Sequence, residues 1–297
     1  MRSFFAHGIL ALAILQLFSD IVGVSPAFGQ DRNVSDRDEF SGKTVATSDM
    51  AWAMVESRNT NAPREGEEAP EFSLRSLADG KMIRLSDLHR EKPVVLILSS
   101  WGCDVFRESL GGITALHNTY GSMAQFVLVY IREAHPIGGF AEHLGRVNDP
   151  KTIEERTAIA KRCKAQLRLS FPVLVDDMDD KVATRWGAWP VRTFVIETDG
   201  RVAYAGMQGP WGYLPYRGFQ HGNGNRTGVD LLYSQETLEE FLEKRFPDAT
   251  QNAQPIPWQE PLQPNPVWQF DSERFSRIPT LPSPLAIRFK SSLPLIQ

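Results

Sequence analysis

Apolar residues form two runs that are too short for helices and too continuous for half-exposed strands. The first is Val94 to Leu98, which follows Pro93 and ends at a pair of serines, and the second is Gln125 to Ile131. Both runs are rich in branched side chains, which favours strands that are buried on both faces of a sheet. We therefore predict that these segments are the central strands.

Helical spacing follows each of the two runs. After the first, Phe106, Leu110 and Leu116 recur at helical intervals with Asp104 near the start, which predicts a helix that opens at or just after Cys103. Another helix is predicted after Asp149-Pro150, with Ile153, Ile159, Ala160, Cys163 and Leu167 on one face.

Two hairpins flank this region. Residues 69–74 and 82–85 alternate apolar and polar around Ala78-Asp79-Gly80. Residues 193–196 and 202–205 are two short runs joined across a Thr-Asp-Gly turn, which predicts the second hairpin.

A short strand, Phe171 to Val175, and a last helix, Gln235 to Phe246 with Ser234 as its N-cap, complete the element list. The order is hairpin, strand, helix, strand, helix, strand, hairpin, helix. This order predicts an α/β fold with a mixed central sheet flanked by helices.

The N-terminus has the pattern of a secretory signal peptide. Arg2 precedes an apolar run from Gly8 to Phe18, and Ala27-Phe28-Gly29 supplies a small-residue cleavage site. An uncleaved membrane anchor is the alternative, but the run is well short of the ~20 residues that span a bilayer. A secreted or periplasmic protein without a membrane span after cleavage is expected.

Composition divides the rest of the chain. Residues 1–29 are assigned to the signal peptide, 30–65 to a polar linker, 66–247 to the globular domain and 248–297 to an extended proline-rich tail. The 297 residues are 42% hydrophobic with a net charge of −4, and Lys and Arg are spread along the chain. This pattern excludes a nucleic-acid binder, and no cluster suggests a metal site.

Cys103 and Cys163 are the two cysteines, so a disulfide framework does not hold the fold together. Cys103 ends a buried strand and opens a helix, where backbone N–H groups and the helix dipole stabilise a thiolate. We predict that it is a nucleophile, although a lone cysteine can also be an inert core residue. His135 follows the other central strand at the sheet edge where ligand sites gather, so its imidazole is predicted either to hold a phenolic or carboxylate group or to relay a proton, with Glu133 orienting it. A solvated loop histidine is the alternative.

The motifs resemble those of thioredoxin-like proteins, a group that includes peroxiredoxins and exported thiol-disulfide proteins. Within that group the chain is most similar to the iodothyronine deiodinase family, over roughly residues 66–246. Three blocks carry this similarity: Ser99 to Phe106, Tyr130 to His135 and Gly209 to Tyr213. Cys103 stands where that family has selenocysteine, and Asp104-Val105 replaces its usual two prolines.

The resemblance implies a thioredoxin-like fold for residues 66–247 and a thiol oxidoreductase. Cys103 would attack a soft electrophile, namely an aryl halide (as in reductive deiodination), a disulfide or a peroxide, and a second thiol would resolve the intermediate. Cys163 is either that resolving thiol or a buried core residue. If it is inert, an external thiol reductant is needed, and no other cofactor is expected.

The resemblance also implies several substrate contacts. Ser100 has the spacing of the threonine or serine that precedes a peroxidatic cysteine, Pro190 has the place of a cis-proline that faces the sulfur, and Arg192 matches a family arginine that binds substrate. Arg192 would clamp a carboxylate or phenolate, or else form a surface salt bridge. The predicted substrate-binding set is Ser100, Trp101, Glu133, Pro190, Arg192 and Trp211.

Two other functions stay open. One is a peroxiredoxin-like thiol peroxidase, and the other is a redox-inactive binding module that uses an aromatic cleft around Trp101, Trp189 and Trp211. The expected partners are a small aromatic or thiol/disulfide substrate and a thiol electron donor. A homodimer is an assembly that the sequence leaves open.

Overall fold

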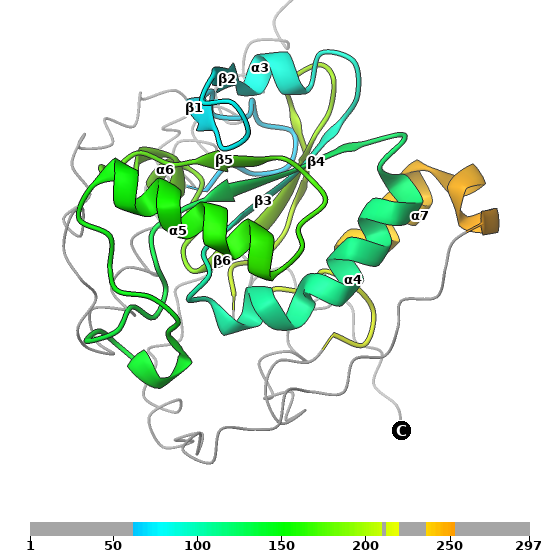
Figure 1. The fold of residues 1–297 in the computed structure, drawn as a ribbon. Coiled ribbons are helices and arrows are strands. Elements are labelled where there is room, and N and C mark those ends of the chain that lie inside the picture. The colour runs from blue at the N-terminus through cyan, green and yellow to red at the C-terminus, as the bar shows by residue number, and fades with distance from the viewer. Residues whose placement is uncertain (1–61, 210–211, 220–235, 253–297) are drawn as a thin grey trace, which may run out of the picture. The chain divides into compact units, whose positions relative to one another are not determined.

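The computed structural model describes residues 62–209, 212–219 and 236–252, which lie within one compact unit of the chain, residues 40–297. Its centre is a seven-stranded sheet of order β2-β1-β5-β4-β3-β6-β7 (Figure 1). The strands are β1 Ser73–Ser76, β2 Met82–Arg84, β3 Val94–Ser99, β4 Gln125–Tyr130, β5 Val173–Val175, β6 Val191–Ile196 and β7 Val202–Ala205.

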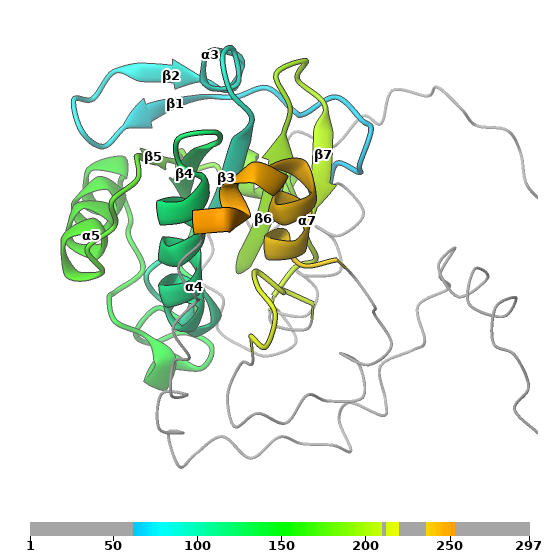
Figure 2. The ribbon, with the colours of Figure 1, turned by 90° about the vertical axis from the view of Figure 1, so that its right-hand side faces the viewer.

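Helices flank this sheet. They are α3 Leu85–Leu88, α4 Asp104–Tyr120, α5 Ile153–Gln166, α6 Lys181–Arg185 and α7 Leu238–Arg245, with 3₁₀ turns η1 Glu142–Leu144 and η2 Pro247–Asn252. Figure 2 shows α4 and α7 in front of the central strands, and α5 beside β5. The prediction of a mixed sheet flanked by helices is confirmed.

The central strand, β3, is buried along all six of its residues. It pairs in parallel with β4 and antiparallel with β6, and β6 pairs antiparallel with β7. A parallel pair needs a crossover connection, which α4 provides. The arrangement β4-β3-β6-β7 is that of the thioredoxin-like core, so the predicted fold class is confirmed.

Neighbouring residues of β6 face opposite sides of the sheet. On one side Val191 lies against Gly209 and near Val105 of α4. On the other side Phe194 packs edge-on against Trp186, which follows α6, with ring centroids 4.9 Å apart. Because successive strand residues alternate between faces, α4 and the end of α6 cover opposite faces.

The strand register gathers three loops at one edge of the sheet. Ser99, the last residue of β3, lies opposite Tyr130 of β4 and Val191 of β6. The loops 100–103 and 131–135 and the pair 189–190 therefore meet at the carboxyl end of β3, which is where open α/β sheets bind ligands.

Two predicted helix starts are wrong in detail. The N-cap of α5 is Thr152, whose hydroxyl accepts a hydrogen bond from the Glu155 N–H at 3.2 Å, rather than Asp149-Pro150. The N-cap of α7 is Thr237, which forms a reciprocal capping box with Glu240, and the predicted cap Ser234 lies outside the described residues. A threonine followed three residues later by glutamate satisfies two backbone donors at once.

The predicted signal peptide and most of the linker and tail lie outside the described residues. Within the part of the chain that the structure describes, no helix has both the length and the apolar character needed to cross a bilayer.

Candidate active site

Cys103 is the N-cap of α4, as predicted. Its N–H donates to the Ser100 carbonyl at 3.2 Å, and its own carbonyl accepts from the Arg107 N–H at 3.2 Å. The residue has no solvent exposure. The Cys103 thiol therefore lies in the protein core, at the N-terminus of α4.

The predicted stabilised thiolate is not the resting state of this site. Burial raises the pKa of the Cys103 thiol to about 12, and the neighbouring Asp104 charge raises it further. Hydrogen bonds from the Phe106 backbone and Ser99, together with the Arg107 charge, lower this pKa but do not compensate. Desolvation thus outweighs the helix terminus, and the thiol is protonated at neutral pH.

His135 is buried beside the start of α4. Its Nδ1 lies 3.1 Å from the Phe140 carbonyl, and its Nε2 lies 3.7 Å from Asp104 Oδ1. The carbonyl requires the proton on Nδ1 in the neutral ring, which leaves Nε2 as the basic nitrogen. Burial lowers the pKa of His135, an effect that Asp104 partly offsets, so the ring is neutral at pH 7.

Glu133 does not orient His135, contrary to the prediction, because its carboxylate is used elsewhere. Its Oε2 accepts from the Gly102 N–H at 2.8 Å, and its Oε1 accepts from the Tyr130 hydroxyl. Burial raises the pKa of this carboxyl to about 7, and its hydrogen bonds partly oppose that shift. Glu133 therefore holds the loop before Cys103 and changes charge near neutral pH.

The two serines before Cys103 have structural partners. Ser99 Oγ donates to the Pro190 carbonyl at 3.0 Å, and Ser100 Oγ accepts from the Ala134 N–H at 3.1 Å. Both serines are completely buried. Ser100 thus ties two loops together in the resting site, and its predicted contact with substrate stays a prediction.

The bond between Trp189 and Pro190 is cis, as predicted. That Pro190 faces the Cys103 sulfur and contacts substrate stays a prediction. Trp189 is 2% exposed, and its indole N–H donates to the Glu133 carbonyl at 3.2 Å. It therefore does not line an open aromatic cleft, as the binding-module prediction required. Trp101 is half-buried, and Trp211 lies outside the described residues.

Arg192 is buried, with its guanidinium group donating to the carbonyls of Gly206 at 2.7 Å and Gly187 at 3.3 Å. Burial lowers its pKa to about 10, so it remains cationic at neutral pH. The predicted surface salt bridge is wrong because the side chain is inside the protein. The predicted substrate clamp is untested.

Cys163 lies on the buried side of α5. Burial and the Glu133 charge raise the pKa of its thiol, and the Arg107 charge lowers it. Arg107 acts on Cys103 in the same direction, so this one cation is within electrostatic reach of both thiols. Whether Cys163 resolves an oxidised Cys103 stays a prediction.

Sequence reasoning missed two members of this site. Tyr130 binds Glu133 through its hydroxyl, and Asp104 lies beside His135. The available signal for Tyr130 was its place near the end of the second apolar run, and the structure pairs it with Ser99, which ends β3.

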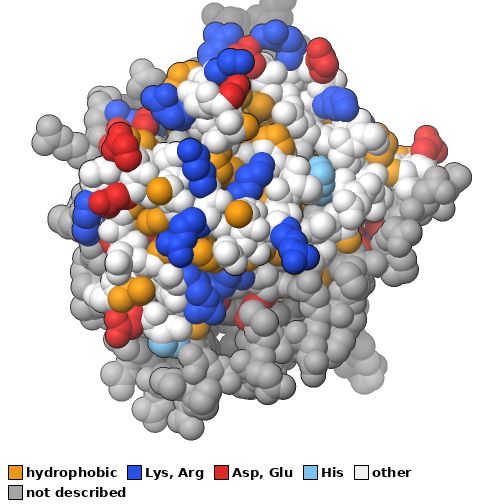
Figure 3. Space-filling view, in the orientation of Figure 1, with side chains coloured by type: hydrophobic (Ala, Val, Ile, Leu, Met, Phe, Trp, Pro, Cys, Tyr) orange, Lys and Arg blue, Asp and Glu red, His pale blue; other side chains and the backbone are white. Residues whose placement is uncertain are grey.

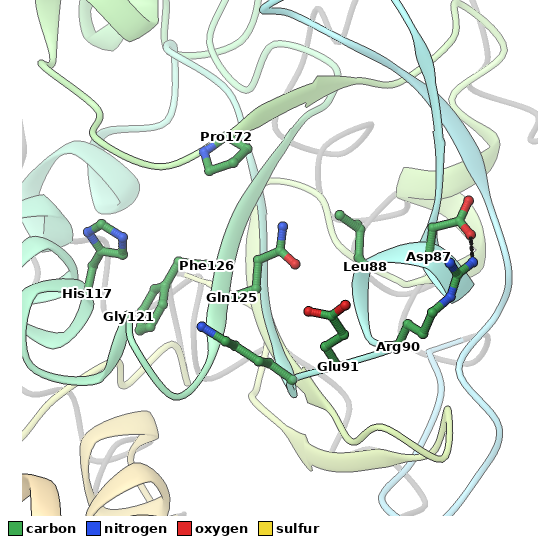
Figure 4. Close-up of a pocket in the computed structure, with 10 residues that line it drawn as sticks. Asp87, Leu88, Arg90, Glu91, His117, Gly121, Gln125, Phe126 and Pro172 are labelled. Atoms are coloured by element: carbon green, nitrogen blue, oxygen red, sulfur yellow. Dashed lines mark hydrogen bonds and ion pairs between the residues drawn. The ribbon is translucent and has the colours of Figure 1, made fainter.

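A hollow of about 510 Å³ lies at the other end of the sheet (Figure 4). It is lined by Asp87, Leu88, Arg90, Glu91, Lys92, His117, Gly121, Gln125, Phe126 and Pro172, which lie near the amino ends of β3, β4 and β5. Cys103 and His135 follow the carboxyl ends, so this hollow is separate from their site. Among the residues that the structure describes, no three His, Cys, Asp or Glu side chains gather as they would around a metal ion.

Cys103 is the N-cap of the helix that follows the central strand, and the neighbouring strand β6 is preceded by a cis-proline. This arrangement defines a thioredoxin-like thiol site. The family model for iodothyronine deiodinase matches residues 4–217. The chain therefore belongs to the iodothyronine deiodinase family.

Known relatives match part of this region. Type I iodothyronine deiodinase of Xenopus laevis is 31% identical over 152 residues, which are 50% of this chain and 59% of that protein. Thyroxine 5-deiodinase of Sparus aurata is 30% identical over 50% of this chain and 56% of that protein. The match thus spans little more than half of each relative. Among solved structures, Peroxidoxin BcpB from Mycobacterium tuberculosis has 22% identity and a TM-score of 0.35, covering 47% of this chain and 82% of that chain.

Proposed function

We propose that this protein is an exported thiol-dependent oxidoreductase in which the Cys103 sulfur attacks a soft electrophile. The electrophile is an aryl halide, as in reductive deiodination, or the sulfur of a disulfide or the oxygen of a peroxide. The observation that carries this proposal is the convergence of Cys103, cis-Pro190 and the His135–Asp104 pair at the carboxyl end of β3. Membership of the deiodinase family supports it.

With an aryl iodide, the thiol is oxidised and the ring is reduced. The carbon–iodine bond breaks, the iodine joins the Cys103 sulfur as a sulfenyl iodide, and the ring carbon keeps the bonding electron pair and takes the thiol proton. A second thiol then attacks the Cys103 sulfur, expels iodide and leaves a disulfide, which a further thiol reduces. Cys163 or an external thiol is the second thiol in this scheme.

His135 is the group that would carry the proton. Its basic Nε2 faces Asp104, the residue after Cys103, and the lowered pKa keeps it able to accept a proton at neutral pH. Since the Cys103 thiol is buried and protonated at rest, the proposal requires an opening of the loop 100–103 before substrate reaches the sulfur.

Iodide release tests the proposal. The protein is incubated with an iodinated phenol and dithiothreitol, which supplies the external second thiol, and iodide release is compared between the wild type and Cys103→Ser. We expect Cys103→Ser to release no iodide above background. Equal iodide release by the wild type and Cys103→Ser would refute a role for this sulfur. Peroxide consumption by the same two proteins, with hydrogen peroxide as substrate, separates a peroxidase from a deiodinase.

The complete burial of Cys103 favours a second candidate, a redox-inactive binding module. This candidate predicts that wild type and Cys103→Ser behave alike in both assays and that Cys103 resists alkylation in the native state. Iodide release or peroxide consumption that depends on Cys103 rules it out.

The proposal includes the predicted export and domain limits. Residues 1–29 would direct secretion or periplasmic delivery, and the domain 66–247 would carry the chemistry. N-terminal sequencing of the protein recovered from outside the cytoplasm tests this, because cleavage after Gly29 would leave Gln30 as the first residue. Recovery of the intact chain in the membrane fraction would instead support the anchor.

A further inference from the structure

The second half of α5 and the segment after it carry only positive charge. From Arg156 to Val175 the sequence has Arg156, Lys161, Arg162, Lys164 and Arg168 but no Asp or Glu. The whole chain has a net charge of −4. This local excess is therefore opposite in sign to the rest of the protein.

The fold turns most of these charges outward. Lys161, Arg162 and Arg168 are exposed and Lys164 is half-buried, and we call these four residues the α5 basic face. Lys161 and Lys164 have the i, i+3 spacing that places side chains along one side of a helix, and Arg168 follows two residues after α5 ends at Gln166. Figure 3 shows Lys and Arg side chains gathered over the middle of the surface that carries α5, with Asp and Glu at its margins.

This face extends to the loop that bears Cys103. The Arg162 guanidinium carbon lies 5.6 Å from the centre of the Trp101 ring, a cation–π contact two residues before the cysteine. On the other side of that loop, the Arg107 guanidinium group donates to the Trp101 carbonyl and to the Leu144 carbonyl. Burial lowers the pKa of Arg107 and the charge of Arg146 lowers it further, so Arg146 is another cation in the same neighbourhood.

A groove of about 370 Å³ borders the face. Arg75, Ile153, Glu154, Thr157, Ala158 and Lys161 line it, so its two cations outnumber its one acid. A concave strip with an apolar floor and basic rim suits the side chains of a folded partner more closely than the flat surface of a bilayer.

We propose that the α5 basic face is the docking surface for an acidic dithiol protein that reduces oxidised Cys103. This rests on the proposed function, because only a redox cycle at Cys103 requires such a donor. Charge complementarity selects an acidic partner, and the Arg162–Trp101 contact places that partner beside the reacting loop.

The reaction balances with the dithiol as reductant. One donor thiolate attacks the Cys103 sulfur and expels the group bound there as an anion, which forms a mixed disulfide. The second donor thiolate attacks the donor sulfur of that disulfide, and Cys103 leaves as a thiolate and takes a proton. Cys103 is reduced, and the donor becomes an internal disulfide.

A binding measurement tests the face without relying on Cys103 chemistry. The probes are two fluorescein-labelled peptides with a central Ser-Gly-Pro-Ser, one flanked by glutamates and the other by glutamines. Their binding to the full chain is measured by fluorescence anisotropy at about 20 mM salt. We expect the acidic peptide to bind about tenfold more tightly than the neutral one. In K161E/R168E this preference disappears, whereas R64E/K92E, a matched change of net charge at two other exposed sites, retains it.

Equal binding of the two peptides, or an unchanged preference in K161E/R168E, would overturn the proposal. So would K161E-sensitive binding to vesicles of phosphatidylglycerol and phosphatidylcholine with no binding of the acidic peptide, since the face would then serve a membrane.

The corresponding dithiol peptides, with Cys-Gly-Pro-Cys, test the redox step on C163A whose Cys103 carries 5-thio-2-nitrobenzoate. We expect faster release of nitrothiobenzoate with the acidic peptide. If the acidic peptide binds but Cys103 cannot be loaded or reduced, the proposed function fails while the docking face stands.

Discussion

The carboxylate of Glu133 accepts a hydrogen bond from the backbone N–H of Gly102 at 2.8 Å, one residue before Cys103. A Cβ atom on Gly102 would lie 2.8 Å from that same oxygen and 3.0 Å from the backbone nitrogen of His135. The loop that delivers Cys103 is thus pressed against the loop that delivers His135, and a titrating carboxyl lies between them.

Glu133 makes stability depend on pH. Because burial raises its folded-state pKa from 4.5 to about 7, the folded protein binds the extra proton, so its contribution is full below pH 4.5 and is lost as pH rises to about 7. Between these two pH values the free energy of unfolding of the wild type should fall by about 3 kcal/mol because of Glu133, and Glu133→Gln should not show this fall. Urea denaturation from about pH 5 to pH 8 measures this, and an unchanged slope would contradict it. Asp176, whose pKa burial also raises to about 7, keeps a residual slope of the same sign.

Gly102→Ala should disturb the site as well as the fold. The new methyl group collides with the Glu133 oxygen and the His135 backbone, which should cost about 1–3 kcal/mol and lower Cys103-dependent turnover. Gly112→Ala is the control, because its Cβ would meet the Tyr216 ring at 2.0 Å, away from Cys103. Equal losses of turnover per folded molecule in the two variants would mean that Gly102 has no special role.

Two charge changes should shift the pKa of His135 in opposite directions. Asp104 raises this pKa and His143 lowers it, so Asp104→Asn should lower it and His143→Gln should raise it. If protonation of His135 sets the acid limb of the pH–rate profile, this limb should move to lower pH in Asp104→Asn and to higher pH in His143→Gln. NMR titration of the imidazole C–H signals measures both shifts, and shifts of the same sign would show that the groups act through altered packing.

Cys103 should react slowly with iodoacetamide in the native protein. Since burial raises its pKa to about 12, the rate should rise about tenfold per pH unit across neutral and mildly alkaline pH. Mass spectrometry of C163A gives this rate without interference from Cys163. A plateau with an apparent pKa below about 8.5, the free-thiol value, would show that the resting sulfur is activated after all.

The cap of α7 should matter for stability but not for turnover. Thr237→Ala removes the hydroxyl that accepts from the Glu240 N–H at 3.1 Å, which should cost about 1 kcal/mol. Thr237→Ser keeps the hydroxyl and should behave like the wild type in thermal unfolding. Similar losses in both variants would assign the effect to the buried methyl group.

The fold was predictable because its signals are local. The uninterrupted apolar run of β3 and the Thr-Asp-Gly turn between β6 and β7 each depend on residues close together in the chain. Short elements such as α3 and α6 were not predicted, since four or five residues carry too little periodicity.

The place of Cys103 at the N-cap was predictable, but its protonation state was not. The helix terminus can be recognised from the sequence, whereas the desolvation that raises the pKa comes from segments distant in the chain. The same holds for Arg192, whose burial depends on Gly206 and Gly187 offering their carbonyls. The α5 basic face was also missed, because the sequence does not show which of these charges are exposed on one surface next to Trp101.

The sheet offers little to a second copy of this chain. Its edge strands, β2 and β7, have three and four residues, and residues 66–69 exchange backbone hydrogen bonds with the segment from Gly200 to Val202 along the outer side of β7. Few N–H and C=O groups are left to recruit a neighbouring strand, which limits ribbon-like polymerisation and amyloid seeding. If copies of this chain do associate, helices and loops would have to supply the contact.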